Sequence, residues 1–181
     1  MSLPRRLLTA AAASILMLTL LSPAALAEPA AIYLVRHAEK ALVGKDPDLS
    51  PQGQGRARNI AAILQRAGIT AIFSTPTART RQTADPLAQR TGVAVQLYDP
   101  GAPRALVDKV RASSGAVLVV GHSNTLPELV RLFGGAPGAE IADDEYDRLY
   151  QLIPGPDGEM KTILLASPAT DAGLAGQHKA M

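Results

Sequence analysis

Short apolar runs alternate with longer segments in which apolar residues recur on one helical face. The runs of strand length are 31–35, 70–74, 93–98, 116–121, 148–153 and 161–166. The segments with helical spacing are 51–67, 77–92, 103–115 and 124–135. Strands that alternate with helices favour a covered, parallel sheet. The pattern therefore predicts an α/β fold, a three-layer α/β/α sandwich with a mostly parallel central sheet.

Residues typical of helix ends mark two of these segments. Ser50 and Pro51 form an N-cap followed by a first helical residue, and Gly68 follows the same segment. The next helix is expected to end at Gly92. Pro86 lies inside it and predicts a kink or a break, because proline lacks the N–H of the helical hydrogen bond.

The N-terminal end of the chain departs from the alternating pattern. Arg5 and Arg6 precede a continuous apolar stretch, and Ala25 and Ala27 supply the small residues typical of a signal peptidase site. We predict that residues 1–27 are a signal peptide. The alternative is a membrane anchor, for which the apolar run is short. The chain contains no cysteine, which excludes a lipid anchor on that residue.

Removal of residues 1–27 changes the charge balance. The whole chain has 18 basic and 16 acidic side chains, and the two arginines of the predicted signal leave 16 of each. A neutral domain gives no reason to expect nucleic acid as a partner. Residues 28–166 are predicted to form one domain, and 167–181 a flexible tail. We expect a periplasmic or secreted bacterial protein without a stable membrane anchor; its oligomeric state stays open.

Cationic and imidazole side chains follow three of the predicted strands. Arg36 and His37 come directly after the first strand, Arg79 shortly after the second, and His122 after the fourth. Ligands of open α/β sheets bind outside the carboxyl ends of the strands. The third histidine of the chain, His178, lies in the predicted tail and receives no role.

The combination of these side chains indicates an anion site. Each residue taken alone is compatible with a structural role, but together they place cations face to face without carboxylates in the same motifs. Guanidinium groups match phosphate oxygens in a bidentate geometry. The segment "GHSNT" is expected to add backbone N–H groups where a helix begins. A zinc site built from His37 and His122 is an alternative that the flanking arginines disfavour.

Four segments, in order from about residue 32 to 125, resemble motifs of one family. They are "LVRHAEK", "LSPQGQGRA", "STPTARTRQTADPLA" and "VLVVGHSNT". Their order and content resemble the histidine phosphatase superfamily, in its small one-domain branch 1 type. That resemblance implies a phosphoglycerate mutase-like fold.

The resemblance also implies roles for individual residues. His37 matches the nucleophile that becomes phosphorylated, and Arg36, Arg79 and His122 match the rest of the phosphate pocket. We expect Asn124 to join this phosphate-binding group. The nearby arginines should keep His37 neutral, and a backbone carbonyl should fix its tautomer. No metal and no other cofactor is expected.

The chain departs from the family pattern at several positions. Ala38 replaces a common glycine, which is a small change, and Arg56 stands where glutamine is usual, on a face expected to be solvated. The Trp-Asn pair of the mutase branch is absent, since the chain has no tryptophan. Ser123 follows the second histidine in place of the aspartate of the phytase-like branch.

These departures leave the general acid open. Asp99, after a predicted strand, is our candidate, with an ordinary turn aspartate as the alternative. Glu39 is expected to support the nucleophile without touching substrate. The acidic segment 143–147 is expected to be a solvated loop.

The sequence thus predicts an exported phosphomonoesterase that hydrolyses a small phosphorylated substrate through a phosphohistidine on His37. The alternatives are a phosphoglycerate-type mutase and a catalytically idle module that binds a phosphorylated ligand.

Overall fold

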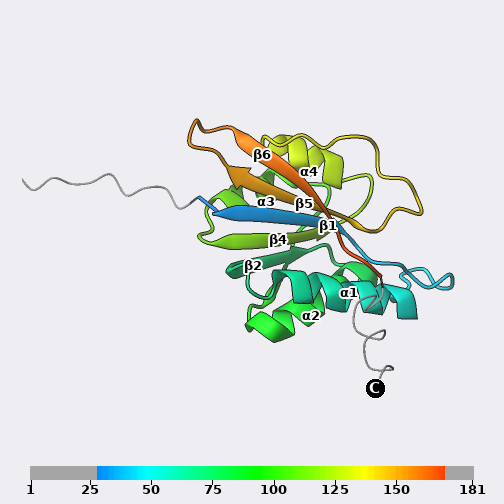
Figure 1. Cartoon of the computed structure of the whole chain (residues 1–181). Coiled ribbons are helices and arrows are strands. Elements are labelled where there is room, and N and C mark those ends of the chain that lie inside the picture. Colours follow the sequence, from blue (N-terminus) through cyan, green and yellow to red (C-terminus); the bar gives the residue numbers. More distant parts are fainter. Residues whose placement is uncertain (1–27, 170–181) are drawn as a thin grey trace, which may run out of the picture.

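The computed structural model describes residues 28–169 and contains one six-stranded sheet in the order β3-β2-β4-β1-β5-β6 (Figure 1). The strands are β1 (Ala31–Arg36), β2 (Ile69–Ser74), β3 (Val95–Leu97), β4 (Ala116–Gly121), β5 (Arg148–Pro154) and β6 (Met160–Ala166). The first four pair in parallel, whereas β5 and β6 add an antiparallel edge. The predicted α/β class and mostly parallel sheet are confirmed.

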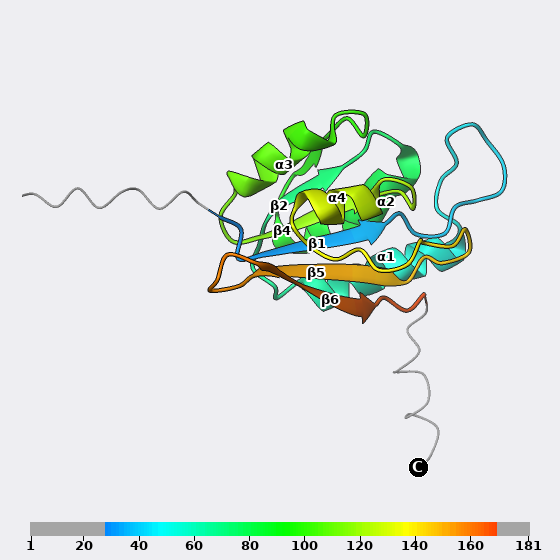
Figure 2. The ribbon, with the colours of Figure 1, turned by 90° about the horizontal axis from the view of Figure 1, so that it is seen from above.

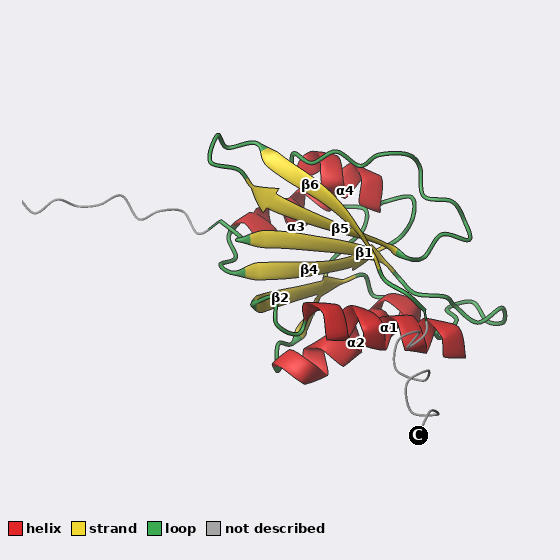
Figure 3. Cartoon of the chain, in the orientation of Figure 1, coloured by secondary structure: helices red, strands yellow, loops and turns green. Residues whose placement is uncertain are grey.

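Helices cover both faces of this sheet, which gives the three predicted layers (Figure 3). The helices are α1 (Pro51–Leu64), α2 (Ala78–Thr91), α3 (Pro103–Arg111) and α4 (Leu126–Leu132). One core cluster joins the sheet to α1 and α2, and a second joins its other face to α3 and α4. All six residues of β1 and of β4 are buried, as expected for strands that are covered on both faces.

The parallel arrangement brings three strand ends together. β4 lies between β1 and β2, so the segments that follow these three strands leave the same edge of the sheet (Figure 2). The N–H of His37 donates to the carbonyl of Gly121 at 2.9 Å, which continues the β1–β4 pairing past the end of the strand. The fold therefore fixes the backbone positions of His37 and His122 relative to each other.

The helix ends agree with the sequence in part. The Ser50 side chain accepts from the N–H of Gly53, as predicted for an N-cap, and Gly92 ends α2 in the left-handed conformation. Helix α1 ends at Leu64, before the predicted boundary at Ala67. Helix α2 runs through Pro86, so the predicted alternative of a break is wrong.

The chain ends fall mostly outside the described residues. The predicted signal peptide, 1–27, and residues 170–181 with His178 are not described. Within residues 28–169, no helix has the length and apolar character needed to cross a membrane. Ser167, the first residue of the predicted tail, is fully buried and its N–H donates to the carbonyl of Asp147. It therefore belongs to the folded domain.

A second contact joins Ser167 to the segment that follows His37. Arg56 on α1 donates to both carboxylate oxygens of Glu39 and to the carbonyl of Ser167. The Arg56 side chain is 8 % exposed, so the expectation of a solvated arginine is wrong. The guanidinium has enough donors to satisfy several buried acceptors at once, which a glutamine side chain does not.

Gly53 permits the close approach of α1 to the same segment. A Cβ at this position would lie 2.1 Å from the carbonyl oxygen of Glu39 and 2.9 Å from the Glu39 amide nitrogen. Both atoms belong to the backbone just after the candidate nucleophile. The absence of a side chain at Gly53 is therefore a condition for the backbone course of residues 38–39.

We expect Gly53→Ala to destabilise the protein by roughly 1–3 kcal/mol, because the added methyl group must displace backbone. The measurement is urea-induced unfolding, beside Gln54→Ala as the control at the next, exposed position. Equal unfolding midpoints for the two variants would contradict this account of the helix contact.

Candidate active site

The structure brings together the side chains that follow β1, β2 and β4. His37 and His122 face each other with ring centroids 5.4 Å apart and an interplanar angle of 65°. A cleft of about 380 Å³ opens beside them, and its wall also includes Arg79, Ser123 and Asn124. The predicted gathering of imidazoles and a guanidinium at the carboxyl edge of the sheet is thus present in the fold.

His37 is buried and held in one orientation. The residue is 4 % exposed, and Nδ1 lies 2.8 Å from the carbonyl oxygen of Ala38. A carbonyl only accepts, so this contact requires a proton on Nδ1 and leaves the lone pair of the neutral ring on Nε2. The Ala38 N–H donates in turn to the hydroxyl of Thr83, which anchors the segment.

Both imidazoles resist protonation. The pKa of His37 is lowered from 6.5 to about 4, chiefly by burial, which disfavours the charged ring. The hydrogen bond to Ala38 acts in the opposite direction, while Arg79, His122 and Arg36 lower the pKa further. The pKa of His122 is also lowered to about 4, first by burial and then by the two arginines. His37 is therefore neutral at pH 7.

A threonine that the sequence did not single out positions His122. Nε2 of His122 lies 3.0 Å from the hydroxyl oxygen of Thr75, the residue directly after β2. Thr75 is fully buried and also contacts the hydroxyl of Thr80 at 2.9 Å. The hydroxyl network ties the His122 ring to the β2–α2 junction, from which Arg79 also projects.

Arg36 is held by the segment that precedes β5. Its Nη1 donates to the carbonyl oxygens of Ala142 and Glu145, both at 2.8 Å. The guanidinium carbon lies 4.1 Å from the ring centroid of Tyr146, a cation–π arrangement. The Tyr146 ring is also 5.9 Å from that of His37. Tyr146 thus belongs to the site, and the expectation of a solvated loop at 143–147 is wrong at this residue.

Arg79 meets a carboxylate that the motifs did not contain. Its Nη1 lies 3.4 Å from an Asp46 oxygen, and the Asp46 carboxylate accepts from the N–H of Ala78 at 3.0 Å. Asp46 reaches this position from the loop between β1 and α1, which extends away from the sheet in Figure 2. Its role is to hold the first turn of α2, and so Arg79, beside the cleft.

The Nε atoms of Arg36 and Arg79 share one property. They are the only buried side-chain nitrogen or oxygen atoms of residues 28–169 that no protein group accepts from or donates to. A buried donor without a partner costs about 1–3 kcal/mol. An anion that reaches these donors would offer acceptors of the kind they require.

The segment "GHSNT" contributes less backbone than predicted. The N–H of His122 donates to the Thr125 hydroxyl, and those of Thr125 and Leu126 donate to the carbonyl of His122. The expectation of free N–H groups is therefore wrong for these three residues. Asn124 is exposed and lines the cleft, which places its side chain beside the predicted phosphate site.

Asp99 lies near the cleft in the geometry of a turn. It is exposed, and its Oδ1 accepts from the N–H of Gly101 at 2.8 Å. The next residue, Pro100, lines the cleft. The alternative interpretation of Asp99 as a turn residue accounts for these contacts, and its carboxylate makes no hydrogen bond to either imidazole of the described site.

Glu39 faces away from the reacting groups. Its carboxylate accepts from Arg56 and from Gln52, so it braces the backbone after His37, as expected for a supporting residue.

Among residues 28–169, no group of three histidine, cysteine or acidic side chains is arranged to hold a metal ion.

Comparison with known proteins agrees with the motifs. Residues 32–100 match the family model described as histidine phosphatase superfamily (branch 1). Two sequence relatives carry the name "Probable phosphoglycerate mutase GpmB". The one from Escherichia fergusonii is 38 % identical over 76 residues, which are 38 % of this chain and 35 % of the relative. The one from Escherichia coli is 32 % identical over 104 residues, 54 % of this chain and 44 % of the relative. The chain thus spans less than half of the relatives it matches.

Solved structures share the fold at lower identity. The protein histidine phosphatase SixA complexed with tungstate has a TM-score of 0.62 and 19 % identity, over 76 % of this chain and 97 % of that one. A mycobacterial glucosyl-3-phosphoglycerate phosphatase with inorganic phosphate has a TM-score of 0.58 and 19 % identity, over 77 % and 97 %. The match over residues 32–100, together with the four ordered motifs, identifies this part of the chain as similar to the histidine phosphatase superfamily, branch 1.

The lowered pKa values predict the pH dependence of both rings. We expect His37 and His122 to titrate near pH 4 by NMR of the ring carbons, and Arg79→Gln to raise both midpoints because Arg79 lowers both pKa values. Since the unfolded state binds more protons between pH 6.5 and about 4, the free energy of unfolding should fall as the pH is lowered through this window. Midpoints near 6.5 would contradict the account.

The position of Tyr146 predicts a role in anion binding. Tyr146→Leu removes the ring from Arg36 and should weaken the affinity for inorganic phosphate about two- to five-fold, as measured by calorimetry. Tyr146→Phe keeps the ring and should bind as the parent protein does. An equal loss in both variants would point to the hydroxyl and against the cation–π contact.

Proposed function

We propose that this protein is a metal-independent phosphomonoesterase that forms a phosphohistidine on His37. The observation that carries the proposal is the pair of buried, unpartnered Nε donors of Arg36 and Arg79 beside a neutral imidazole. The two guanidinium groups supply positive charge and donors for phosphate oxygens. The imidazole supplies an unprotonated nitrogen.

The first step uses the lone pair on Nε2 of His37. It forms a bond to phosphorus while the bond from phosphorus to the ester oxygen breaks, and the electron pair leaves on that oxygen. Arg36 and Arg79 hold the oxygens of the transferring group and stabilise its charge, so positioning and electrostatics supply most of the rate. The Ala38 carbonyl retains the proton of Nδ1 and stabilises the cationic ring of the phosphohistidine.

The second step is hydrolysis. A water oxygen attacks phosphorus, the N–P bond breaks, and its electrons return to Nε2, so that His37 is regenerated and inorganic phosphate is released. The His122 ring centroid is 5.4 Å from that of His37, and we propose that this ring contacts the same phosphoryl group. Thr75 fixes its orientation. A dianionic phosphoryl group on His37 favours the protonated form of a nearby imidazole. His122 is therefore the imidazole that can supply a proton within the site.

The leaving oxygen also needs a proton, and Asp99 remains our proposal as its donor. Turnover of esters with good leaving groups does not depend on this acid, whereas esters of alkyl alcohols do. A para-nitrophenyl ester therefore tests His37 chemistry without testing the acid. Retention of nitrophenyl activity with loss of alkyl activity in Asp99→Asn would support Asp99.

The proposed reaction uses no metal ion, and water, not a second substrate hydroxyl, accepts the phosphoryl group. Two flanking arginines make a cation site between the imidazoles unfavourable. A mutase must keep water from its phosphoenzyme, whereas the cleft beside His37 opens to the surface at Asn124. We further propose that the enzyme acts after export, in the periplasm or outside the cell, on the basis of the predicted signal peptide.

We expect the protein without residues 1–27 to hydrolyse para-nitrophenyl phosphate, and His37→Ala to reduce kcat at least a thousand-fold because the nucleophile is lost. His178→Ala is the matched control and should keep the parent rate. Vanadate should inhibit, and a chelator should leave the rate unchanged.

The outcomes separate the alternatives. Activity that survives in His37→Ala contradicts the phosphohistidine mechanism. Binding of inorganic phosphate without any turnover would identify the catalytically idle module, and loss of activity with chelator would restore the metal alternative.

A further inference from the structure

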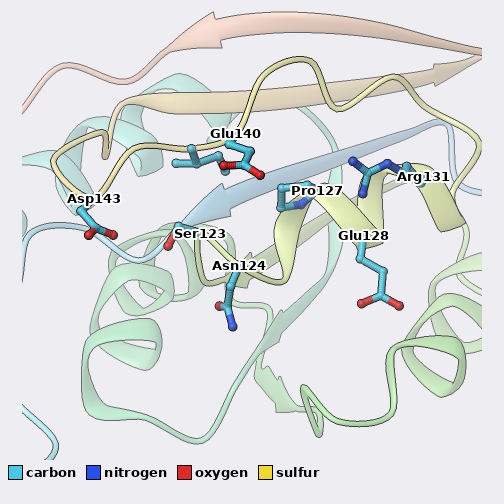
Figure 4. Close-up of a pocket in the computed structure, with 8 residues that line it drawn as sticks. Ser123, Asn124, Pro127, Glu128, Arg131, Glu140 and Asp143 are labelled. Carbon is cyan, nitrogen blue, oxygen red and sulfur yellow. The ribbon is translucent and has the colours of Figure 1, made fainter.

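A second cleft adjoins the cleft that lies beside His37 and His122. It has a volume of about 460 Å³ and lies between α4 and the segment 140–143 (Figure 4). Ser123 and Asn124 line both clefts, so the two are continuous at the segment that follows β4. A group bonded to a phosphate at His37 can extend past these two residues into the larger cleft.

The far wall of this cleft is fixed to the phosphate site. Arg36, one of the two arginines of that site, donates to the carbonyl oxygens of Ala142 and Glu145. The segment that carries Glu140 and Asp143 is therefore held at a set position relative to the phosphoryl group. This coupling gives the second cleft the geometry of a leaving-group subsite.

The charge of the second cleft is unbalanced. Three carboxylates and one guanidinium line it, and Figure 4 shows them on both of its walls: Glu128, Glu140, Asp143 and Arg131. None of these four side chains forms an ion pair with another residue of the described chain. Their charges thus remain available to a ligand, and the net sign is negative.

We propose that this cleft receives the alcohol part of the substrate and selects an ester that carries a protonated amine, such as an amino sugar or an amino alcohol. The proposal rests on the phosphatase function proposed above. An amine in the cleft gains attraction from the carboxylates, while the phosphate gains it from the arginines at the other end. A leaving group that carries a carboxylate, as in a phosphoglycerate, meets repulsion.

The test compares three esters as competitive inhibitors of para-nitrophenyl phosphate hydrolysis at pH 6.5 and low salt. Glucosamine 6-phosphate and glucose 6-phosphate differ by an amine in place of a hydroxyl, and 3-phosphoglycerate adds a carboxylate. We expect the amino sugar ester to bind about five-fold more tightly than the glucose ester, and the glycerate ester to bind most weakly. Inhibition reports binding even where an alkyl ester is hydrolysed slowly.

Charge variants then assign the preference to the cleft. The quantity compared is the inhibition constant of glucose 6-phosphate divided by that of glucosamine 6-phosphate. The triple variant Glu128→Gln, Glu140→Gln, Asp143→Asn should bring this ratio to about one. Arg131→Gln should increase the same ratio, since it removes the guanidinium from the described residues that line the cleft. Asp108→Asn, an exposed carboxylate on α3, is the control and should leave the ratio unchanged.

Each outcome decides one proposal. Hydrolysis of the nitrophenyl ester with equal binding of the two sugar esters overturns the amine preference and leaves the phosphatase function intact. Tighter binding of 3-phosphoglycerate would overturn it as well. Absence of nitrophenyl hydrolysis overturns the proposed function, and the substrate preference falls with it.

Discussion

The positive charge that Arg36 and Arg79 place beside His37 is the constraint on which the site depends. Two guanidinium groups attract a phosphate, but they also oppose protonation of the nearby His37 imidazole. Burial acts in the same direction and more strongly. The same arrangement therefore binds the electrophile and keeps the nucleophile neutral. The cost is two buried donors without a protein partner, and a phosphate offsets that cost only while it is bound.

The rest of the fold keeps these cations in place without neutralising them. β1 ends at Arg36, His37 follows it, and all six residues of the strand are buried by packing on both faces. The two backbone carbonyls that accept from Arg36 orient it and carry no full negative charge. Among residues 28–169, Arg79 forms an ion pair with Asp46, at the long distance of 3.4 Å. Charge is thus positioned by dipoles and packing, which leaves it available to a ligand.

The sequence could predict whatever depended on local pattern. Alternating apolar segments located the six strands and four helices, and the strand ends located Arg36, His37, Arg79 and His122, because parallel strands bring their carboxyl ends to one edge. A backbone carbonyl was predicted as the tautomer partner of His37, and the structure identifies it as that of Ala38, the next residue in the chain. Pro86 predicted a possible break in the second helix. Helix α2 nevertheless continues through it, because tertiary packing can override the low helix propensity of proline.

Contacts between distant segments could not be predicted in this way. Tyr146 stands in an acidic, polar stretch, and only the return of the chain to β5 brings its ring over Arg36, 110 positions earlier in the sequence. Arg56 has helical spacing typical of a solvated face, yet Glu39 and the Ser167 carbonyl bury it. Asp46 has no motif of its own. In each case the decisive partner comes from another element, and no periodicity in the sequence carries that information.

Phosphorylation of His37 can be tested by trapping the phosphorylated protein. A nitrophenyl ester would be mixed with the protein, the reaction would be quenched in alkali within milliseconds to seconds, and the peptides would be sequenced by mass spectrometry. We predict one phosphoryl group on the peptide that contains His37 and none on the peptide that contains His122. A phosphoryl group on another residue, or rapid hydrolysis with no phosphorylated peptide at any time, would contradict it.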